Sequence, residues 1–450
     1  MGVWARAVAV AAVAGTGLAV VSGAAGWGTA HRLLAAVALP PLAALVAITW
    51  VAARRFLPVA LAALVLFGLA ALLTGRDIHL ALAALSFGAT VLLAALVWRG
   101  HVEQGPARDY VTLTKPRIMS LLLLTGAAGV FVGAGGVPAA STFAFTMIGL
   151  ALACGGASAL NHYLDRDIDR LMGARTEQRP VASGRVAPER ALEFGLALSA
   201  FSFVLLDSLV NLPTALLALA GNLFYVVVYT RWLKRSTSQN IVIGGAAGAV
   251  PPLVGYAGAA GHLGWAAVAM FGIVFVWTPP HFWALALMIK EHYARAGIPM
   301  LPVERGERET ARQIVWYTVV LVIVTLVPVA LGIFGLTYAV AAAVLGALFA
   351  WYALELRRTL ERRSAAKLFH YSLLYLALLF IAMALDTVIS VTEPLDDTEL
   401  ELDAEGTHPL SDPDAELARR NLQFGWALVG LFILLFAGTV GVAFAYSWLS

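Results

Sequence analysis

Three oxygen-bearing side chains recur at four-residue intervals in the segment NHYLDRDID: Asn161, Asp165 and Asp169. Steps of four residues advance about 400° around an α-helix, so each side chain lies about 40° from the last and the three share one face. Asp167 points elsewhere. Mg²⁺ prefers oxygen ligands and is usually completed by substrate phosphates and water, so the shared face predicts a magnesium site. The alternative is a solvated helix end paired with nearby arginines, which fits Asp167 best.

Other polar residues are expected near this segment, either because they follow it in the sequence or because they lie at the same depth in the membrane. Arg175 and Arg179 follow it in a polar loop, and arginine can bind phosphate through paired hydrogen bonds, which lysine cannot match. The alternative for these two is charge that only sets membrane orientation. Tyr229 and Lys234 lie at the end of a later helix. We expect them at the same membrane depth as the Asn161–Asp169 segment, and they are candidate catalytic residues.

A second polar cluster interrupts a long apolar stretch at Trp277-Thr-Pro279-Pro280-His281. Two adjacent prolines are expected to break the helix in mid-span, which membrane proteins tolerate where the backbone lines a cavity. Trp277 and His281 are therefore predicted to form a pocket wall.

The elements that position these residues are predicted to be membrane helices. The chain of 450 residues is 60% hydrophobic and only 13% charged, whereas soluble domains carry about 25% charged residues. Apolar stretches of about twenty residues recur, and each can span a bilayer as a helix. A net charge of +3 without a basic tract argues against nucleic-acid binding. The single cysteine, Cys154, lies among small apolar residues and is expected only to pack.

Four regions follow from the pattern of apolar stretches and loops. Residues 1–104 hold four predicted helices, residues 105–391 hold nine, residues 392–420 form an acidic loop, and residues 421–450 hold a last helix. The four N-terminal helices are expected at 5–26, 31–53, 56–74 and 78–98. The nine of the middle region are expected at 117–136, 142–163, 190–211, 213–229, 240–259, 264–289, 313–335, 337–355 and 368–390, and the last at 421–448.

Basic residues gather in the loops on one side of this topology. Lys115 and Arg117 precede the first helix of the middle region, and the arginine-rich loops follow its even-numbered helices. The positive-inside rule makes this side cytoplasmic, so the predicted metal and phosphate residues face the cytoplasm.

Seven motifs occur in an order that carries a specific resemblance: DYVTLTKPR from Asp109, the Asn161–Asp169 run, Arg175-Thr176, Tyr229-Thr230, WTPPHFWALAL, AGIPMLP, and LFHYSLLYLALLF from Leu368. Together they resemble the heme O synthases (protoheme IX farnesyltransferases), a branch of the UbiA-type intramembrane prenyltransferases. The resemblance covers residues 108–390.

The resemblance implies an all-α integral membrane protein: a nine-helix UbiA-type bundle around a cavity, with about four extra N-terminal helices and one extra C-terminal helix. Farnesyl diphosphate would bind with Mg²⁺, ionise to an allylic cation and alkylate a vinyl group of heme b, giving heme O. The protein would be multi-pass in the plasma membrane of a prokaryote. Substrate contacts are then assigned to Lys115, Arg117, Arg175, Arg179, Trp277, His281, Glu291 and His370.

One position departs from the family pattern. Related sequences place an acidic residue directly before the tyrosine that matches Tyr293, but this chain has His292 there and Glu291 one step earlier. A second metal site is therefore in doubt, and Glu291 is the candidate that remains.

The N-terminal region resembles half of heme A synthase, a four-helix bundle with a histidine on two helices. His31 and His79 begin two predicted helices. The likeness implies that they are axial ligands of an additional heme. Heme A synthase is also expected as a partner. The alternative is two histidines at membrane interfaces.

Two rival functions stay open on the sequence. One is a prenyltransferase of the same superfamily with a quinone or lipid acceptor. The other is a heme-binding membrane redox or transport protein, for which His31 and His79 are the only support.

Overall fold

The computed structural model describes residues 107–392 and, before them, residues 8–16, 19, 37–46, 60–61, 63–67, 86 and 90. Every described residue before 107 is helical. His31, His79, the predicted boundary at residue 104 and all of residues 393–450 lie outside the described residues.

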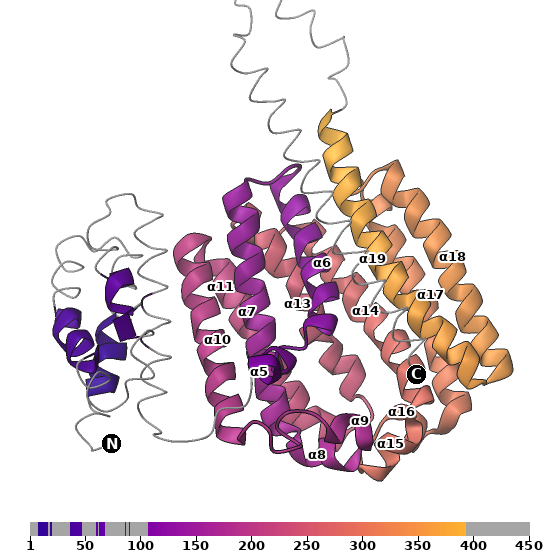
Figure 1. Cartoon of the computed structure of the whole chain (residues 1–450). Helices are drawn as coiled ribbons and strands as arrows, with labels where there is room; N and C mark the ends of the chain where they lie inside the picture. The colour runs from indigo at the N-terminus through magenta and orange to yellow at the C-terminus, as the bar shows by residue number, and fades with distance from the viewer. Residues whose placement is uncertain are drawn as a thin grey trace, which may run out of the picture. The chain divides into compact units, whose positions relative to one another are not determined.

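The described part of the chain contains helices and no strand (Figure 1). Nine of these helices are long and apolar enough to cross a membrane, which confirms the predicted fold class. Their bounds are α6 Pro116–Ala134, α7 Ala140–Leu164, α10 Pro188–Leu209, the continuous stretch Leu212–Ser236, α13 Asn240–Ala260, α14 Trp265–Met288, α17 Gly306–Ala330, α18 Leu336–Thr359 and α19 Arg362–Thr392.

Two helices begin earlier than their apolar stretches predict. Helix α17 starts at Gly306 instead of residue 313, and α19 starts at Arg362 instead of residue 368. In α17 the added first turn carries Glu307 and Glu309, and acidic side chains stabilise a helix N-terminus. Hydropathy alone therefore underestimates these helices, because their polar first turns are still helical.

The chain divides into two compact units. The first contains residues up to Pro116 and Ile148–Val226, and the second contains Arg117–Met147 and Val227 onward. Short helices complete them: α5 Ala107–Leu113, α8 Arg166–Leu171 and α9 Ala174–Glu177 in the first unit, and α12 Lys234–Ser236, α15 Lys290–Arg295 and α16 Leu301–Glu304 in the second. Within Leu212–Ser236, α11 Leu212–Leu223 leads into the π-helix η2 Phe224–Leu233.

Side-chain hydrogen bonds to backbone carbonyls join the helices of the first unit. The Ser158 hydroxyl donates to the carbonyl of Leu113 at 2.7 Å and so fixes α5 against α7. The Ser202 hydroxyl of α10 donates to the carbonyl of Gly149 at 2.6 Å. Such bonds are a common means of holding helices together in lipid, where the hydrophobic effect provides little force between them.

Glycines allow α6 and α13 of the second unit to pack backbone against backbone. A Cβ atom on Gly129 would collide with the carbonyl oxygen of Pro252, and one on Gly255 would collide with that of Gly126. Small residues at helix interfaces permit this close approach in membrane proteins. The position of α13, which leads to α14, is therefore set by the absence of side chains along this seam.

Helix α14 corrects one prediction, because the proline pair does not break it. The helix runs without interruption from Trp265 to Met288 with Pro279 and Pro280 inside. Each proline removes one backbone donor, but prolines are tolerated in membrane helices where neighbouring helices and hydroxyl side chains compensate. The prolines leave the carbonyls of Phe275 and Val276 without their usual donors, and the packing of α14 against α13, α17 and α19 holds the helix continuous.

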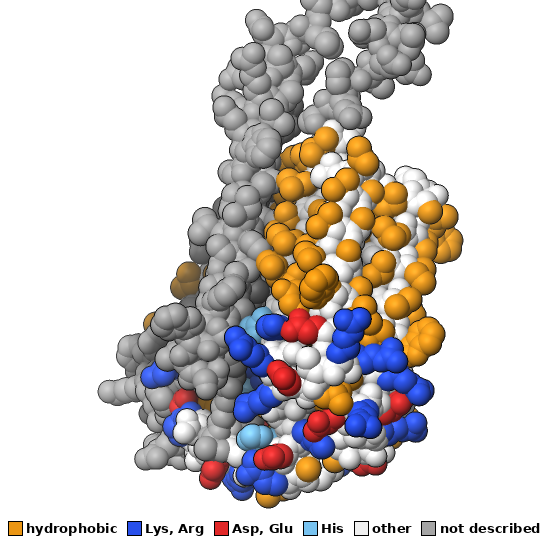
Figure 2. All heavy atoms as spheres, turned by 90° about the vertical axis from the view of Figure 1, so that its right-hand side faces the viewer, with side chains coloured by type: hydrophobic (Ala, Val, Ile, Leu, Met, Phe, Trp, Pro, Cys, Tyr) orange, Lys and Arg blue, Asp and Glu red, His pale blue; other side chains and the backbone are white. Residues whose placement is uncertain are grey.

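The face formed by α17, α18 and α19 shows a band of hydrophobic side chains bounded at one end by charged ones (Figure 2). Trp316 and Trp351 are 61% and 69% exposed there, as expected for side chains that face lipid. The charged end carries the exposed residues Arg305, Arg308, Arg312, Arg357, Arg358, Arg362 and Arg363.

Asp386 is a buried charge of this unit with a structural explanation. Its carboxylate accepts hydrogen bonds from the backbone N–H groups of Gly335 at 2.6 Å and Tyr338 at 3.2 Å. These groups lie at the N-terminus of α18, where a carboxylate satisfies free donors and the helix dipole.

Candidate functional site

The oxygen face, which we define as Asn161, Asp165 and Asp169, is buried in the first unit. The three side chains are 3%, 0% and 1% exposed, whereas Asp167 is exposed. The Asn161 amide donates to Asp165 Oδ2 at 2.8 Å. Although α7 ends at Leu164 and α8 begins at Arg166, the backbone bonds from Asp165 to Asn161 and from Asp169 to Asp165 keep the four-residue repeat. The shared face predicted from the spacing is therefore confirmed.

Lys115 reaches this face from the segment between α5 and α6. Its ammonium donates to Asn161 Oδ1 at 2.6 Å. The backbone of Lys115 is left-handed, with φ of 50°, which is uncommon for a residue with a side chain. Such strain persists only where the surroundings enforce it, and it is often found at functional sites.

The loop after α8 folds back onto Asp169. Arg179 Nη1 donates to Asp169 Oδ1 at 2.6 Å, and the Thr176 hydroxyl donates to the Asp169 backbone carbonyl at 2.8 Å. Arg179 is still 32% exposed, so its guanidinium retains donors that can bind another anion. Arg175 lies in α9 of the same loop. The face thus has two cations in contact with it, Lys115 and Arg179.

Tyr225 is a residue of this site that the sequence motifs missed. It lies in η2, and its hydroxyl is within electrostatic range of Asp165, Asp169 and Arg179. Its spacing of four residues from Tyr229 was the available signal. Tyr229 and Lys234 belong to the second unit and are both half-buried. π-Helices are rare and frequently mark functional sites, which favours a role for this stretch.

In the second unit, His281 is clamped between two aromatic rings. Trp277 stacks on one side at 4.3 Å between ring centroids and 15° between planes. Phe369 of α19 also stacks on it, at 4.8 Å and 21°. His281 is 7% exposed and Trp277 is 5% exposed. The predicted wall of Trp277 and His281 is thus present on a continuous helix, with Phe369 as an added member.

Ser372 of α19 orients both of the α14 rings. Its backbone carbonyl accepts from Trp277 Nε1 at 2.9 Å, and its hydroxyl lies 2.6 Å from His281 Nδ1. The same hydroxyl donates to the Phe369 carbonyl at 2.7 Å. Both short contacts are satisfied when His281 Nδ1 carries the proton, which leaves the lone pair on Nε2. We call Trp277, His281, Phe369 and Ser372 the histidine platform.

His370, which follows Phe369 in α19, also has its Nδ1 engaged in a hydrogen bond. Its Nδ1 lies 2.7 Å from the carbonyl oxygen of Ala366, and because a carbonyl can only accept, Nδ1 is protonated and Nε2 carries the lone pair. Metal-binding histidines commonly bond through one ring nitrogen while the other donates to such an acceptor. Both His281 and His370 are therefore in the tautomer whose Nε2 can bind a metal.

The remaining predicted site residues are on the surface. Arg117 and Glu291 are both exposed, and within the described residues neither side chain has a hydrogen-bond partner. Within the same residues, no group of three or more His, Cys, Asp or Glu side chains could hold a metal. The oxygen face is a different kind of group, because it has two carboxylates and one amide.

The fold and the oxygen face can be compared with known protein families. The model of the UbiA prenyltransferase family matches residues 122–383. The chain belongs to the UbiA prenyltransferase family. That match includes the oxygen face, η2 and the histidine platform.

Relatives within the UbiA prenyltransferase family share one name. The chain is 55% identical over 291 residues to a protoheme IX farnesyltransferase of Symbiobacterium thermophilum, covering 64% of this chain and 97% of that protein. It is 45% identical over 403 residues to a protoheme IX farnesyltransferase of Roseiflexus sp. strain RS-1, covering 80% of this chain and 75% of that protein. Because 80% of this chain is more than residues 107–392 contain, this likeness extends beyond them.

A solved structure agrees in fold. A structure described as digeranylgeranylglyceryl phosphate synthase has a TM-score of 0.54 and 19% identity, and the match covers 63% of this chain and 98% of that chain. The likeness supports the UbiA helix arrangement alone.

Proposed function

We propose that this protein transfers the farnesyl group of farnesyl diphosphate to a vinyl group of heme b, giving heme O. The observation that carries the proposal is the buried oxygen face with Lys115 and Arg179 donating to it. Two buried carboxylates within a membrane helix bundle are costly, and they are functional by default. The protoheme IX farnesyltransferase relatives support heme b as the acceptor.

The oxygen face fits Mg²⁺, since it offers only oxygen donors from Asn161, Asp165 and Asp169, and hard divalent cations prefer these. Mg²⁺ bound there would neutralise the charge that develops on the leaving diphosphate.

Lys115 and Arg179 are proposed to bind the diphosphate. Both cations now donate to side chains of the oxygen face, so the phosphate oxygens of a substrate bound at this face lie within their reach. Arg175 adds a third cation from the same loop. Donors that are already in place stabilise the leaving diphosphate without reorganisation when the C–O bond breaks.

The acceptor is proposed to bind at the histidine platform, with the heme iron on Nε2 of His281 or His370. The aromatic rings of Trp277 and Phe369 provide an apolar wall that fits a porphyrin. In the balanced reaction, the allylic C–O bond breaks and diphosphate leaves. The vinyl group then forms a C–C bond to the farnesyl carbon, and water adds to the resulting cation and releases a proton.

Three further assignments belong to this proposal. The oxygen face lies on the cytoplasmic side, because the basic loops mark that side. His31 and His79 bind an additional heme, and a heme A synthase receives the product. The last two rest on the sequence resemblance.

The direct test uses the purified full-length protein with heme b and farnesyl diphosphate. Mass spectrometry of the extracted pigment is expected to show heme O when Mg²⁺ is present and only heme b when EDTA replaces it. A quinone acceptor supplied in place of heme b tests the rival prenyltransferase function. Prenylation of the quinone without heme O formation contradicts the proposal.

A further inference from the structure

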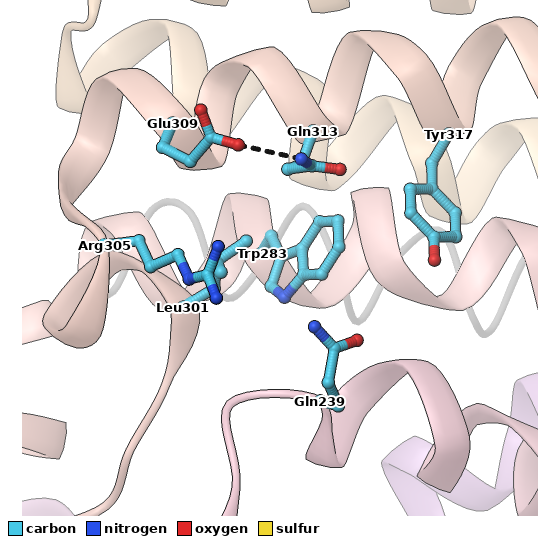
Figure 3. A pocket seen from close by; sticks show the side chains of 7 residues that line it. All are labelled: Gln239, Trp283, Leu301, Arg305, Glu309, Gln313 and Tyr317. Atoms are coloured by element: carbon cyan, nitrogen blue, oxygen red, sulfur yellow. Dashed lines mark hydrogen bonds between the residues drawn. The ribbon is translucent and has the colours of Figure 1, made fainter.

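A small cavity of about 100 Å³ lies in the second unit (Figure 3), and its α14 residue, Trp283, follows His281 of the histidine platform by two residues. It is lined by side chains from α14, α16, α17 and the residue before α13. These are Gln239, Trp283, Leu301, Arg305, Glu309, Gln313 and Tyr317.

The indole N–H of Trp283 is the most informative group of this cavity. Trp283 is 2% exposed, and its Nε1 has no hydrogen-bond partner among the described residues. Its ring is held edge-on to Tyr317, with 5.3 Å between centroids and 90° between planes. In Figure 3 the indole nitrogen faces the side chain of Gln239. The indole nitrogen can only donate, and a buried donor without an acceptor is unfavourable, so a ligand atom that accepts would complete it.

The charges around the cavity favour an anion. The carboxylate of Glu309 is already engaged, because it accepts from the Gln313 amide at 2.8 Å and pairs with Arg312 at 3.4 Å. Arg305, in contrast, forms no side-chain hydrogen bond or ion pair with any residue that the structure describes. Trp283 and Arg305 thus supply free donors, and a guanidinium binds phosphate oxygens in pairs.

The position of the cavity along α17 indicates where the anion comes from. Arg305 stands at the charged end of the helix, whereas Trp316, beside the lining residue Tyr317, is 61% exposed. Exposed tryptophans are typical of the level of lipid headgroups, and Figure 2 shows that the apolar band of this face is bounded at one end by charged side chains. We propose that this cavity binds the headgroup phosphate of an anionic membrane phospholipid, whose acyl chains lie along the apolar face of α17.

The test measures lipid binding to the full-length protein in detergent with EDTA present. Native mass spectrometry is used with phosphatidylglycerol, with diacylglycerol of the same acyl chains, and with inorganic phosphate. One phosphatidylglycerol molecule is expected to bind, and diacylglycerol, which lacks phosphate, is expected to bind at least tenfold more weakly. Inorganic phosphate binding as tightly as the lipid would overturn the lipid assignment in favour of a site for soluble phosphate.

Matched variants locate the site. Trp283→Phe removes the N–H and keeps an aromatic ring against Tyr317, and Arg305→Gln removes a positive charge that lines the cavity. Each is expected to weaken phosphatidylglycerol binding about tenfold. The controls Trp351→Phe on α18 and Arg308→Gln on α17 change exposed residues outside the cavity and should leave phosphatidylglycerol binding unchanged. Equal lipid affinity in the wild type, Trp283→Phe and Arg305→Gln overturns the proposal, whatever the outcome for heme O formation.

Discussion

Ser372→Ala tests whether the histidine platform binds heme through a fixed tautomer. The change removes the hydroxyl that lies 2.6 Å from His281 Nδ1 and leaves the Trp277 bond to the Ser372 backbone carbonyl. A buried hydrogen bond of this kind contributes about 0.5–1.5 kcal/mol, which corresponds to roughly a 2- to 13-fold change in affinity. Loss of the partner that orients a metal-binding histidine typically lowers metal affinity about 10- to 100-fold.

We expect heme to bind about tenfold more weakly to Ser372→Ala, because a tenfold loss of affinity lies within both of these ranges. The stacking rings of Trp277 and Phe369 still hold the imidazole plane, which argues against a larger loss. The assay is a heme titration followed by absorbance, with farnesyl diphosphate binding measured in parallel and expected to be unchanged.

The matched control is Ser364→Ala. Ser364 is also buried on α19, but its hydroxyl accepts from Thr359 at 2.9 Å and has no histidine partner. A heme affinity of Ser372→Ala equal to that of the wild type refutes the tautomer argument. An equal loss in both variants also refutes it, because the effect would then be general destabilisation of α19.

Two further predictions concern other parts of the chain. Asp165→Asn is expected to abolish heme O formation with the thermal unfolding temperature preserved, whereas Asp167→Asn, on an exposed residue, should be far milder; equal activities of the two variants contradict the assigned face. A protein starting near Glu103 is expected to keep heme O formation, because an even number of predicted helices is removed. If His31 and His79 bind heme, only the full-length form retains a low-spin heme after the catalytic pocket is emptied, which difference spectra measure.

The sequence was sufficient where one chemical pattern repeats along one element. The spacing of Asn161, Asp165 and Asp169 predicts their shared face, because helix geometry alone decides it. The apolar stretches likewise predict the nine membrane helices that the structure describes. Their polar first turns, as at Gly306, were missed because hydropathy does not measure helix formation.

Other features depend on contacts between elements that are distant in the sequence. Ser372 is 95 residues from Trp277, and nothing near it in the sequence indicates that its hydroxyl orients His281. The proline pair at Pro279 was expected to break the helix, because the prediction considered the lost backbone donors and not the packing of neighbouring helices around them. Tyr225 was missed because no motif includes it.

The left-handed backbone of Lys115 sets stability and activity against each other. This conformation destabilises the folded state by about 1–3 kcal/mol when the residue is not glycine. Glycine would adopt the same φ of 50° without that strain. Lys115→Gly would relieve this strain but would also remove the 2.6 Å hydrogen bond from the ammonium to Asn161, and the two effects on stability are of similar size. If the ammonium serves the diphosphate as proposed, a glycine that is neutral for stability would still discard the function. Directed evolution toward a more robust enzyme therefore has to hold position 115 constant, and a consensus built from stable but inactive variants would be misleading at this residue.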